Sequence, residues 1–161
     1  MITVQLENVS REVHVALKAA HDNAARFGRS YIGAEDLLFG LMYSPGHEVQ
    51  SSVARIMRQH FDVGRSQVSD AIKSIAVRST TSVVHEQQLP GGIRFTRSVL
   101  RALKLSGALN PKEHTKRFDI LTGLVKTRDA MLLHVLKDLN IDPQRLEEVA
   151  KNPNLPLVGS R

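Results

Sequence analysis

The stretch "GRSYIGAEDLLFGL", from Gly28 to Leu41, returns in weaker form as "KRFDILTGLV", from Lys116 to Val125. Apolar residues recur in both at steps of three and four, which predicts a short helix with one buried face. Residues 37–41 map onto 120–124 at an offset of 83. A phrase repeated in this way indicates an internal repeat of a larger unit. The expected inner faces are Leu37, Leu38, Leu41 and Met42 in the first copy, and Ile120, Leu121, Leu124 and Val125 in the second.

The helix that precedes each copy belongs to the same repeat. Val9, Val13 and Leu17 map onto Phe95, Val99 and Leu103 at an offset of 86. Each half of the chain shows four helical patterns, and "SVVH" is the one strand-like run. We therefore predict an all-α fold without a β-sheet. It should hold eight helices in two pseudo-twofold-related four-helix repeats, with matching helix lengths in the two halves.

Turn and cap residues divide the chain. Residues 78–92, "RSTTSVVHEQQLPGG", are rich in Ser, Thr and Gln and end in Pro-Gly-Gly, which is typical of a linker. Ser66 and Thr96 are predicted helix caps, and Asp142-Pro143 predicts a helix start. We predict a single domain over residues 1–161, with repeat 1 at about 6–76, a linker at about 77–93, repeat 2 at about 94–151 and a tail at 152–161.

Composition bounds the class of protein. A chain of 161 residues with 42% apolar and 24% charged residues is typical of a soluble globular domain. It contains no apolar run of the roughly 20 residues that cross a bilayer, and no secretory signal is visible. The absence of cysteine excludes disulfides, thiol catalysis and thiolate metal sites. We expect a cytoplasmic protein without membrane contact.

The charge is concentrated in the second half of the chain. Residues 94–129 hold nine Lys or Arg against three acidic residues, which matches the formal net charge of +6 for the whole chain. Such a field indicates an acidic partner, either protein or nucleic acid. Aromatic residues make up only 4% of the chain and tryptophan is absent, so there is little for stacking on bases. Nucleic acid is therefore the less favoured partner.

The first copy of the phrase resembles the Clp N-terminal repeat domain, which precedes the ATPase modules of Clp-family unfoldases. The family phrase is close to Gly-His-Asn-Tyr-Ile-Gly-Thr-Glu-His-Leu-Leu-Leu-Gly-Leu. The "RFTRSVLRAL" of residues 94–103 resembles the opening of the family's second repeat, and the resemblance covers about residues 6–150. The second repeat is degenerate. Matching residues in the first are Gly28, Tyr31, Ile32, Gly33, Glu35, Leu37, Leu38, Gly40 and Leu41.

The resemblance implies a non-catalytic protein-binding module of the Clp chaperone and protease system. Such a module recruits substrates or adaptors, or docks on Clp ATPase or protease subunits. No Gly-x-x-x-x-Gly-Lys-Ser/Thr phosphate loop is present, so this chain is not the ATPase motor. Two alternatives stay open: the N-terminal fragment of a full Clp ATPase, and a basic helical nucleic-acid-binding protein. We expect no enzyme activity, no cofactor and no metal, because no His-Glu-x-x-His or comparable ligand pattern occurs.

Two groups of residues are candidate partner-binding sites. Arg94, Arg97, Arg101 and Lys104 follow a spacing of i, i+3, i+7 and i+10, which predicts one basic helix face. That face is either simply solvated or a contact for an acidic protein. Phe95, within the same motif, is included as a candidate partner-binding residue.

The second group is Glu35-Asp36, at the start of a predicted helix. Acidic residues there complement the helix dipole. The family resemblance implies in addition that Glu35 grips the guanidinium of a phosphorylated arginine. Its counterpart in the second repeat is Phe118, with Asp119 beside it. A phenyl ring cannot accept the hydrogen bonds of a guanidinium. At most one phosphoarginine site per chain is expected.

Overall fold

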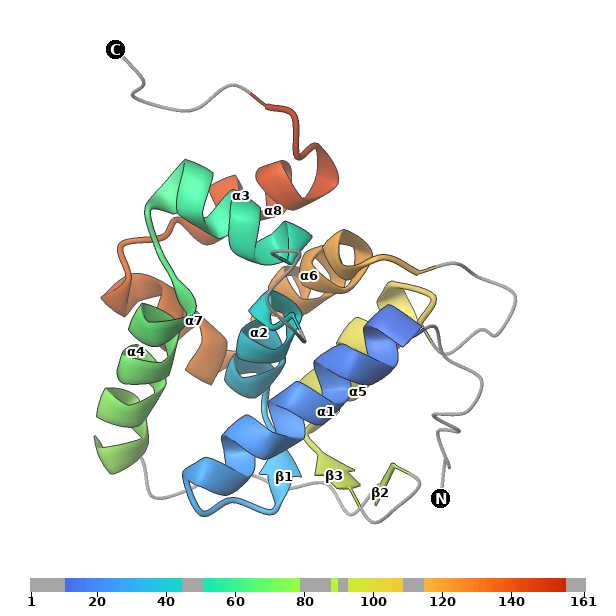
Figure 1. The fold of residues 1–161 in the computed structure, drawn as a ribbon, viewed down its shortest axis with the longest axis vertical. Helices are drawn as coiled ribbons and strands as arrows, with labels where there is room; N and C mark the ends of the chain where they lie inside the picture. Colours follow the sequence, from blue (N-terminus) through green and yellow to red (C-terminus); the bar gives the residue numbers. More distant parts are fainter. Residues whose placement is uncertain (1–10, 45–50, 79–87, 90–92, 109–114, 156–161) are drawn as a thin grey trace.

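The computed structural model describes residues 11–44, 51–78, 88–89, 93–108 and 115–155, and within them the chain is built from eight helices (Figure 1). The all-α prediction is confirmed. The first four helices are α1 (Arg11–Arg26), α2 (Ala34–Met42), α3 (Ser52–Phe61) and α4 (Arg65–Arg78). The last four are α5 (Arg97–Leu105), α6 (Arg117–Lys126), α7 (Ala130–Asp138) and α8 (Pro143–Lys151).

Two of the three predicted cap positions are confirmed. The Thr96 hydroxyl accepts a hydrogen bond from the Val99 amide, and Asp142 caps α8 with Pro143 at its first position. Ser66 was the wrong choice, because α4 already begins at Arg65. The carbonyl of Gly64 accepts from the Val68 amide, so Ser66 lies within the first turn.

The two repeats pack their first helix pair in the same way. Gly40 of α2 lies against α1, where an added Cβ would stand 2.2 Å from the carbonyl oxygen of Ala16. Gly123 of α6 lies against α5, where a Cβ would stand 2.8 Å from the carbonyl oxygen of Ala102. The two glycines are 83 positions apart and the two alanines 86, as the sequence offsets predict. A residue without a side chain lets two helix backbones approach closely, so each repeat contains one such crossing.

Contacts between the repeats follow the same pseudo-twofold relation. Helix α3 contacts α8, and α4 contacts α7, while α2 and α6 meet at the centre. Helices α3 and α8 form one end of the molecule, with the short strands at the opposite end (Figure 1). The buried apolar side chains of both repeats form a single continuous core. The two repeats therefore share one hydrophobic core and are not separate domains joined by a linker.

The expectation that no sheet would form was wrong. Three short strands, β1 (Tyr31–Ile32), β2 (Gln88–Leu89) and β3 (Ile93–Phe95), form a sheet in the order β1-β3-β2. β1 pairs in parallel with β3, and β2 pairs antiparallel with it. Runs of two or three residues are too short to show a period of two in the sequence. β2 lies within the predicted linker, of which residues 77–78 belong to α4 and 93 to β3, while 79–87 and 90–92 lie outside the described part of the chain.

Helix lengths match less well than expected. α1 has 16 residues and α5 nine, and α4 has 14 against nine in α8. Both α1 and α5 are followed by a glycine, and the next residues, Arg29 and Ala108, donate their amides to Ala24 and Leu103 at 3.0 Å. The offset between equivalent residues therefore changes from 86 at the crossing to 79 here. The first helix of the second repeat is therefore about two turns shorter than that of the first.

Candidate functional site: a buried charge cluster and an exposed basic helix

A cluster of charged side chains lies at the start of α2, and Asp36 is its centre. Asp36 is fully buried. Its carboxylate accepts hydrogen bonds from the Gly33 amide and the Asn23 side chain, each at 2.9 Å. Arg29 donates to both of its oxygens, with Nη1–Oδ2 at 2.5 Å and Nη2–Oδ1 at 2.7 Å. Four donors on one carboxylate compensate for the loss of water around a buried charge.

Arg29 is the cation of this cluster, and the sequence reasoning missed it. Its guanidinium lies 5.5 Å from the centroid of the Tyr31 ring and 6.0 Å from that of Phe27. Burial by itself lowers the pKa of Arg29, but the hydrogen bond to Asp36 and the charges of Asp36 and Glu35 outweigh it and raise the pKa. The one signal in the sequence was a cation six and seven residues before two adjacent carboxylates, but the burial that makes the pairing necessary is seen only in the structure.

Glu35 shares the same guanidinium. Its Oε1 accepts from Arg29 Nη1 at 2.9 Å, and the residue is only 4% exposed. Burial, followed by the charge of Asp36, raises the pKa of Glu35 to about 7 against an ordinary value of 4.5. Asp129, at the start of α7, adds to this shift. The carboxylate expected to grip a client guanidinium is therefore bound by a guanidinium of its own chain.

Neither Glu35 nor Arg29 has a charged equivalent in the second repeat. Phe118 stands at the position of Glu35, and Ala108 at that of Arg29. Asp119 keeps the role of Asp36 toward the backbone, since it accepts from the Lys116 amide at 2.9 Å. Ala108 is buried, and Phe118 packs against the core. Two apolar residues thus occupy, in the second repeat, the positions of the ion pair in the first.

A buried arginine, Arg117, connects the two repeats. It is the first residue of α6, and its Nη1 donates to the carbonyl oxygens of Leu41 at 2.9 Å and Gly40 at 3.4 Å. These carbonyls end α2, where the negative pole of the helix dipole lies. Burial lowers the pKa of Arg117. No pattern in the sequence pointed to this role, because the equivalent residue in the first repeat is Ala34.

The predicted basic face is only partly a helix face. Arg97, Arg101 and Lys104 are exposed on α5. Arg94 is exposed too, but it lies in β3, because Thr96 caps α5 and the preceding residues pair with β1. The expectation that all four share one helix was wrong for Arg94. Phe95 points the opposite way and is fully buried, as the alternation of a strand requires.

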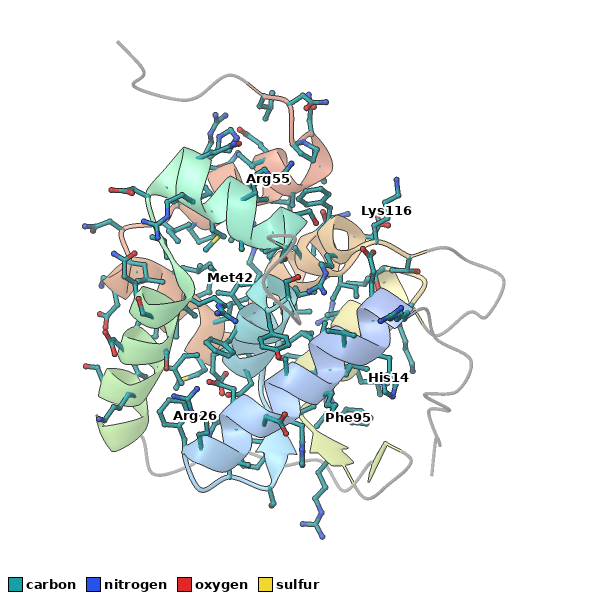
Figure 2. The ribbon with its side chains drawn as sticks, viewed as in Figure 1. His14, Arg26, Met42, Arg55, Phe95 and Lys116 are labelled. Carbon is teal, nitrogen blue, oxygen red and sulfur yellow. The ribbon has the colours of Figure 1, made fainter. Side chains whose placement is uncertain are left out.

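The labelled side chains in Figure 2 separate interior from surface. Met42 is buried in α2, and Phe95, the last residue of β3, is buried as well (Figure 2). His14 and Lys116 project outward and are exposed (Figure 2). In the described ranges, no group of three or more His, Asp or Glu side chains could hold a metal ion. None of the helices there is long and apolar enough to span a bilayer.

Comparison with solved structures bears on the fold. The N-terminal domain of the caseinolytic protease associated chaperone ClpD from Arabidopsis thaliana matches with a TM-score of 0.65 and 15% sequence identity. The match covers 91% of this chain and 94% of that domain. The chain has a Clp N-domain-like fold. No family model matches the sequence, and no curated protein matches it either.

A structure from a study of a malarial protein secretion system is also similar to this chain. It matches with a TM-score of 0.60 and 13% identity, over 91% of this chain and 94% of that one. At this level of identity the likeness concerns the fold. Within the Clp N-domain-like fold of this chain, the buried Arg29 cluster belongs to the first repeat and the exposed cations of α5 to the second.

Proposed function

We propose that this chain is a non-catalytic protein-binding module of a Clp chaperone and protease system. It recruits protein substrates or adaptors, or docks on a Clp ATPase or protease subunit. The observation that carries the proposal is the Clp N-domain-like fold, matched over 91% of the chain and 94% of the ClpD domain. A likeness over nearly the whole of both chains supports a module of the same kind.

The distribution of charge supports a role on the surface. The acidic pair Glu35-Asp36 is buried and already bound by Arg29, so its charges stabilise the fold and do not face a partner. The cations of α5 face solvent instead. Exposed groups of one sign steer and orient a partner of opposite sign. The proposed partner surface therefore includes α5.

A phosphoarginine site at Glu35, which the family resemblance implied, requires one further step. An incoming guanidinium would have to displace that of Arg29, which holds Glu35 and Asp36 together. The proposal therefore includes no phosphoarginine site. The proposal for a protein-binding module does not depend on it.

The proposal includes the setting in which the module is the front end of a complete Clp ATPase. A stand-alone chain would act in trans, and an attached one in cis. The nucleic-acid alternative rests on the same exposed cations. It differs from the proposal in its ligand, so one experiment separates them.

The test is direct binding to the Clp ATPase of the same organism. The purified chain and the purified ATPase are mixed with a slowly hydrolysed ATP analogue, and the complex is followed by sedimentation velocity. We expect the chain to co-sediment with the ATPase ring. A parallel titration with duplex DNA at about 50 mM salt provides the comparison. No association with the ATPase, with a Clp protease subunit or with a purified adaptor would contradict the proposal, and tight DNA binding would favour the alternative.

A further inference from the structure

Helix α5 presents three cations in a line. Arg97, Arg101 and Lys104 are spaced by four and three residues, which places them on one face over about 10 Å of helix. All three are exposed, whereas the opposite face of α5 is buried in the core. The buried residues are Val99, Leu100, Ala102 and Leu103.

These three cations have no side-chain partner within the described part of the chain. None of them forms an ion pair or a side-chain hydrogen bond there. Asp129 is an acidic residue that reaches α5, but its carboxylate accepts from the Ser98 hydroxyl at 2.7 Å and from the Leu132 amide at 3.0 Å. A row of unpaired like charges repels itself, so it favours a partner that supplies carboxylates.

An apolar side chain adjoins the row. Leu105, at the end of α5, is 55% exposed and is the one large hydrophobic residue classed as exposed among the described residues. It follows Lys104 directly and stands one turn beyond Arg101. A leucine left in water beside three cations offers an anchor for an apolar side chain of a partner.

The first repeat has no such surface. The residues equivalent to Arg97, Arg101, Lys104 and Leu105 at the offset of 86 are Arg11, Val15, Lys18 and Ala19. An aliphatic residue replaces the central cation, and Ala19 is buried because α1 continues beyond it. The row of three cations and the exposed leucine therefore occur together on α5 and not on α1.

We propose that the exposed face of α5, formed by Arg97, Arg101, Lys104 and Leu105, binds an acidic protein segment that carries an apolar side chain among its carboxylates. This inference rests on the protein-binding function proposed above and names the site and the chemistry of its partner. A protein segment fits better than a nucleic acid for two reasons. A phosphate backbone offers nothing to Leu105, and α5 holds no aromatic side chain on which a base could stack.

The test uses a fluorescein-labelled peptide of about 12 residues, with glutamates at helical spacing and one central leucine. Its binding to the whole chain is followed by fluorescence anisotropy at about 50 and about 500 mM salt. Two further probes replace the glutamates with glutamine, or the leucine with serine. A duplex DNA competitor tests the other class of ligand.

Three protein variants complete the design. Arg97→Glu combined with Arg101→Glu should weaken binding of the acidic peptide by at least about tenfold and flatten its salt dependence. Leu105→Ser should weaken it by about tenfold, and this loss should vanish with the leucine-free probe. The matched control, Lys18→Glu with Lys137→Glu, makes the same change in net charge at exposed positions of α1 and α7 and should bind within about twofold of the unchanged chain. Circular dichroism confirms that each variant is folded.

Four outcomes would overturn the inference. They are no binding of the acidic peptide, equal losses in the α5 variant and its control, no dependence on Leu105, or displacement of the peptide by DNA at lower concentration. Association with the Clp ATPase without peptide binding would remove this inference and leave the proposed function intact. Peptide binding without any Clp association would do the reverse.

Discussion

Arg29 and Asp36 form a two-pronged ion pair in the interior of the first repeat, with Nη1–Oδ2 at 2.5 Å and Nη2–Oδ1 at 2.7 Å. The pair ties the turn after α1 to the first turn of α2. It also leaves Glu35 dependent on the same guanidinium. The first four predictions follow from this cluster and from its counterpart in the second repeat.

Arg29→Ala should destabilise the chain by about 3–5 kcal/mol, because two buried carboxylates would be left without their cation. The measurement is the free energy of unfolding in urea. Adding millimolar methylguanidinium should raise the melting temperature of this variant and not that of the unchanged chain. A loss below about 1 kcal/mol would show that the pair contributes little.

Combining Arg29→Ala with Glu35→Phe should recover part of that loss. The double variant copies the arrangement of the second repeat, where Ala108 and Phe118 occupy the two positions. Asp36 keeps its bonds to the Gly33 amide and to Asn23, as Asp119 keeps its bond to the Lys116 amide. A double-mutant cycle measures the coupling between the two positions. Additive losses would contradict the equivalence of the two sites.

The raised pKa of Glu35 predicts a pH dependence of stability. Because the pKa is about 7 in the folded chain and 4.5 as the reference, the folded state binds the proton more tightly. Protonated Glu35 therefore adds about 3 kcal/mol to the free energy of unfolding below about pH 4.5. This contribution is lost as the pH rises through about 7. Burial lowers the pKa of His60, which acts in the opposite sense, so the comparison must be with Glu35→Gln. In that variant the free energy of unfolding should no longer decline between about pH 5 and 8. An unchanged pH profile would contradict a raised pKa of Glu35.

Free phosphoarginine should give no detectable heat of binding in titration calorimetry with the unchanged chain. The reason is that Glu35 is buried and already accepts from Arg29. A stoichiometric binding curve that disappears in Glu35→Ala would show instead that the ligand displaces Arg29.

The two crossing glycines should differ in their tolerance of alanine. A Cβ at Gly40 would stand 2.2 Å from the Ala16 carbonyl oxygen, and one at Gly123 would stand 2.8 Å from that of Ala102. Backbone atoms cannot move aside as a side chain does, so both changes strain the crossing, by about 1–3 kcal/mol or more. We expect Gly40→Ala to lower the urea midpoint more than Gly123→Ala. The reverse order would mean that the α1–α2 contact is the more adaptable one.

The helical repeat was predictable because it depends on many residues. Apolar positions such as Leu37 and Leu121 recur with a period that a helix imposes, and Thr96 and Asp142 mark helix starts by chemistry that acts within four residues. The offsets of 83 and 86 between the repeats also hold for the glycines and alanines of the two helix crossings, which the structure revealed. Long, periodic segments carry this information along the chain.

What the sequence did not reveal depends on contacts between distant residues. The pairing of Tyr31 with Arg94 joins positions too far apart for a local pattern. The same holds for Arg117, whose acceptors are 76 and 77 residues away. Glu35 was recognised as a carboxylate at a helix start, but whether it faces a ligand or Arg29 is decided by burial, which no local pattern reports.

The contact of Arg117 with the end of α2 has a consequence for the origin of the chain. It belongs with the α3–α8 and α4–α7 contacts, all of which join one half to the other. A polypeptide holding a single half could bury these surfaces only by pairing with another copy of itself, at a cost that depends on its concentration. Covalent fusion makes that association intramolecular, since each half then meets its partner at a high effective concentration. Once fused, the halves were no longer bound to be identical, and one could hold an internal salt bridge while the other carried apolar residues at those positions and a shorter first helix.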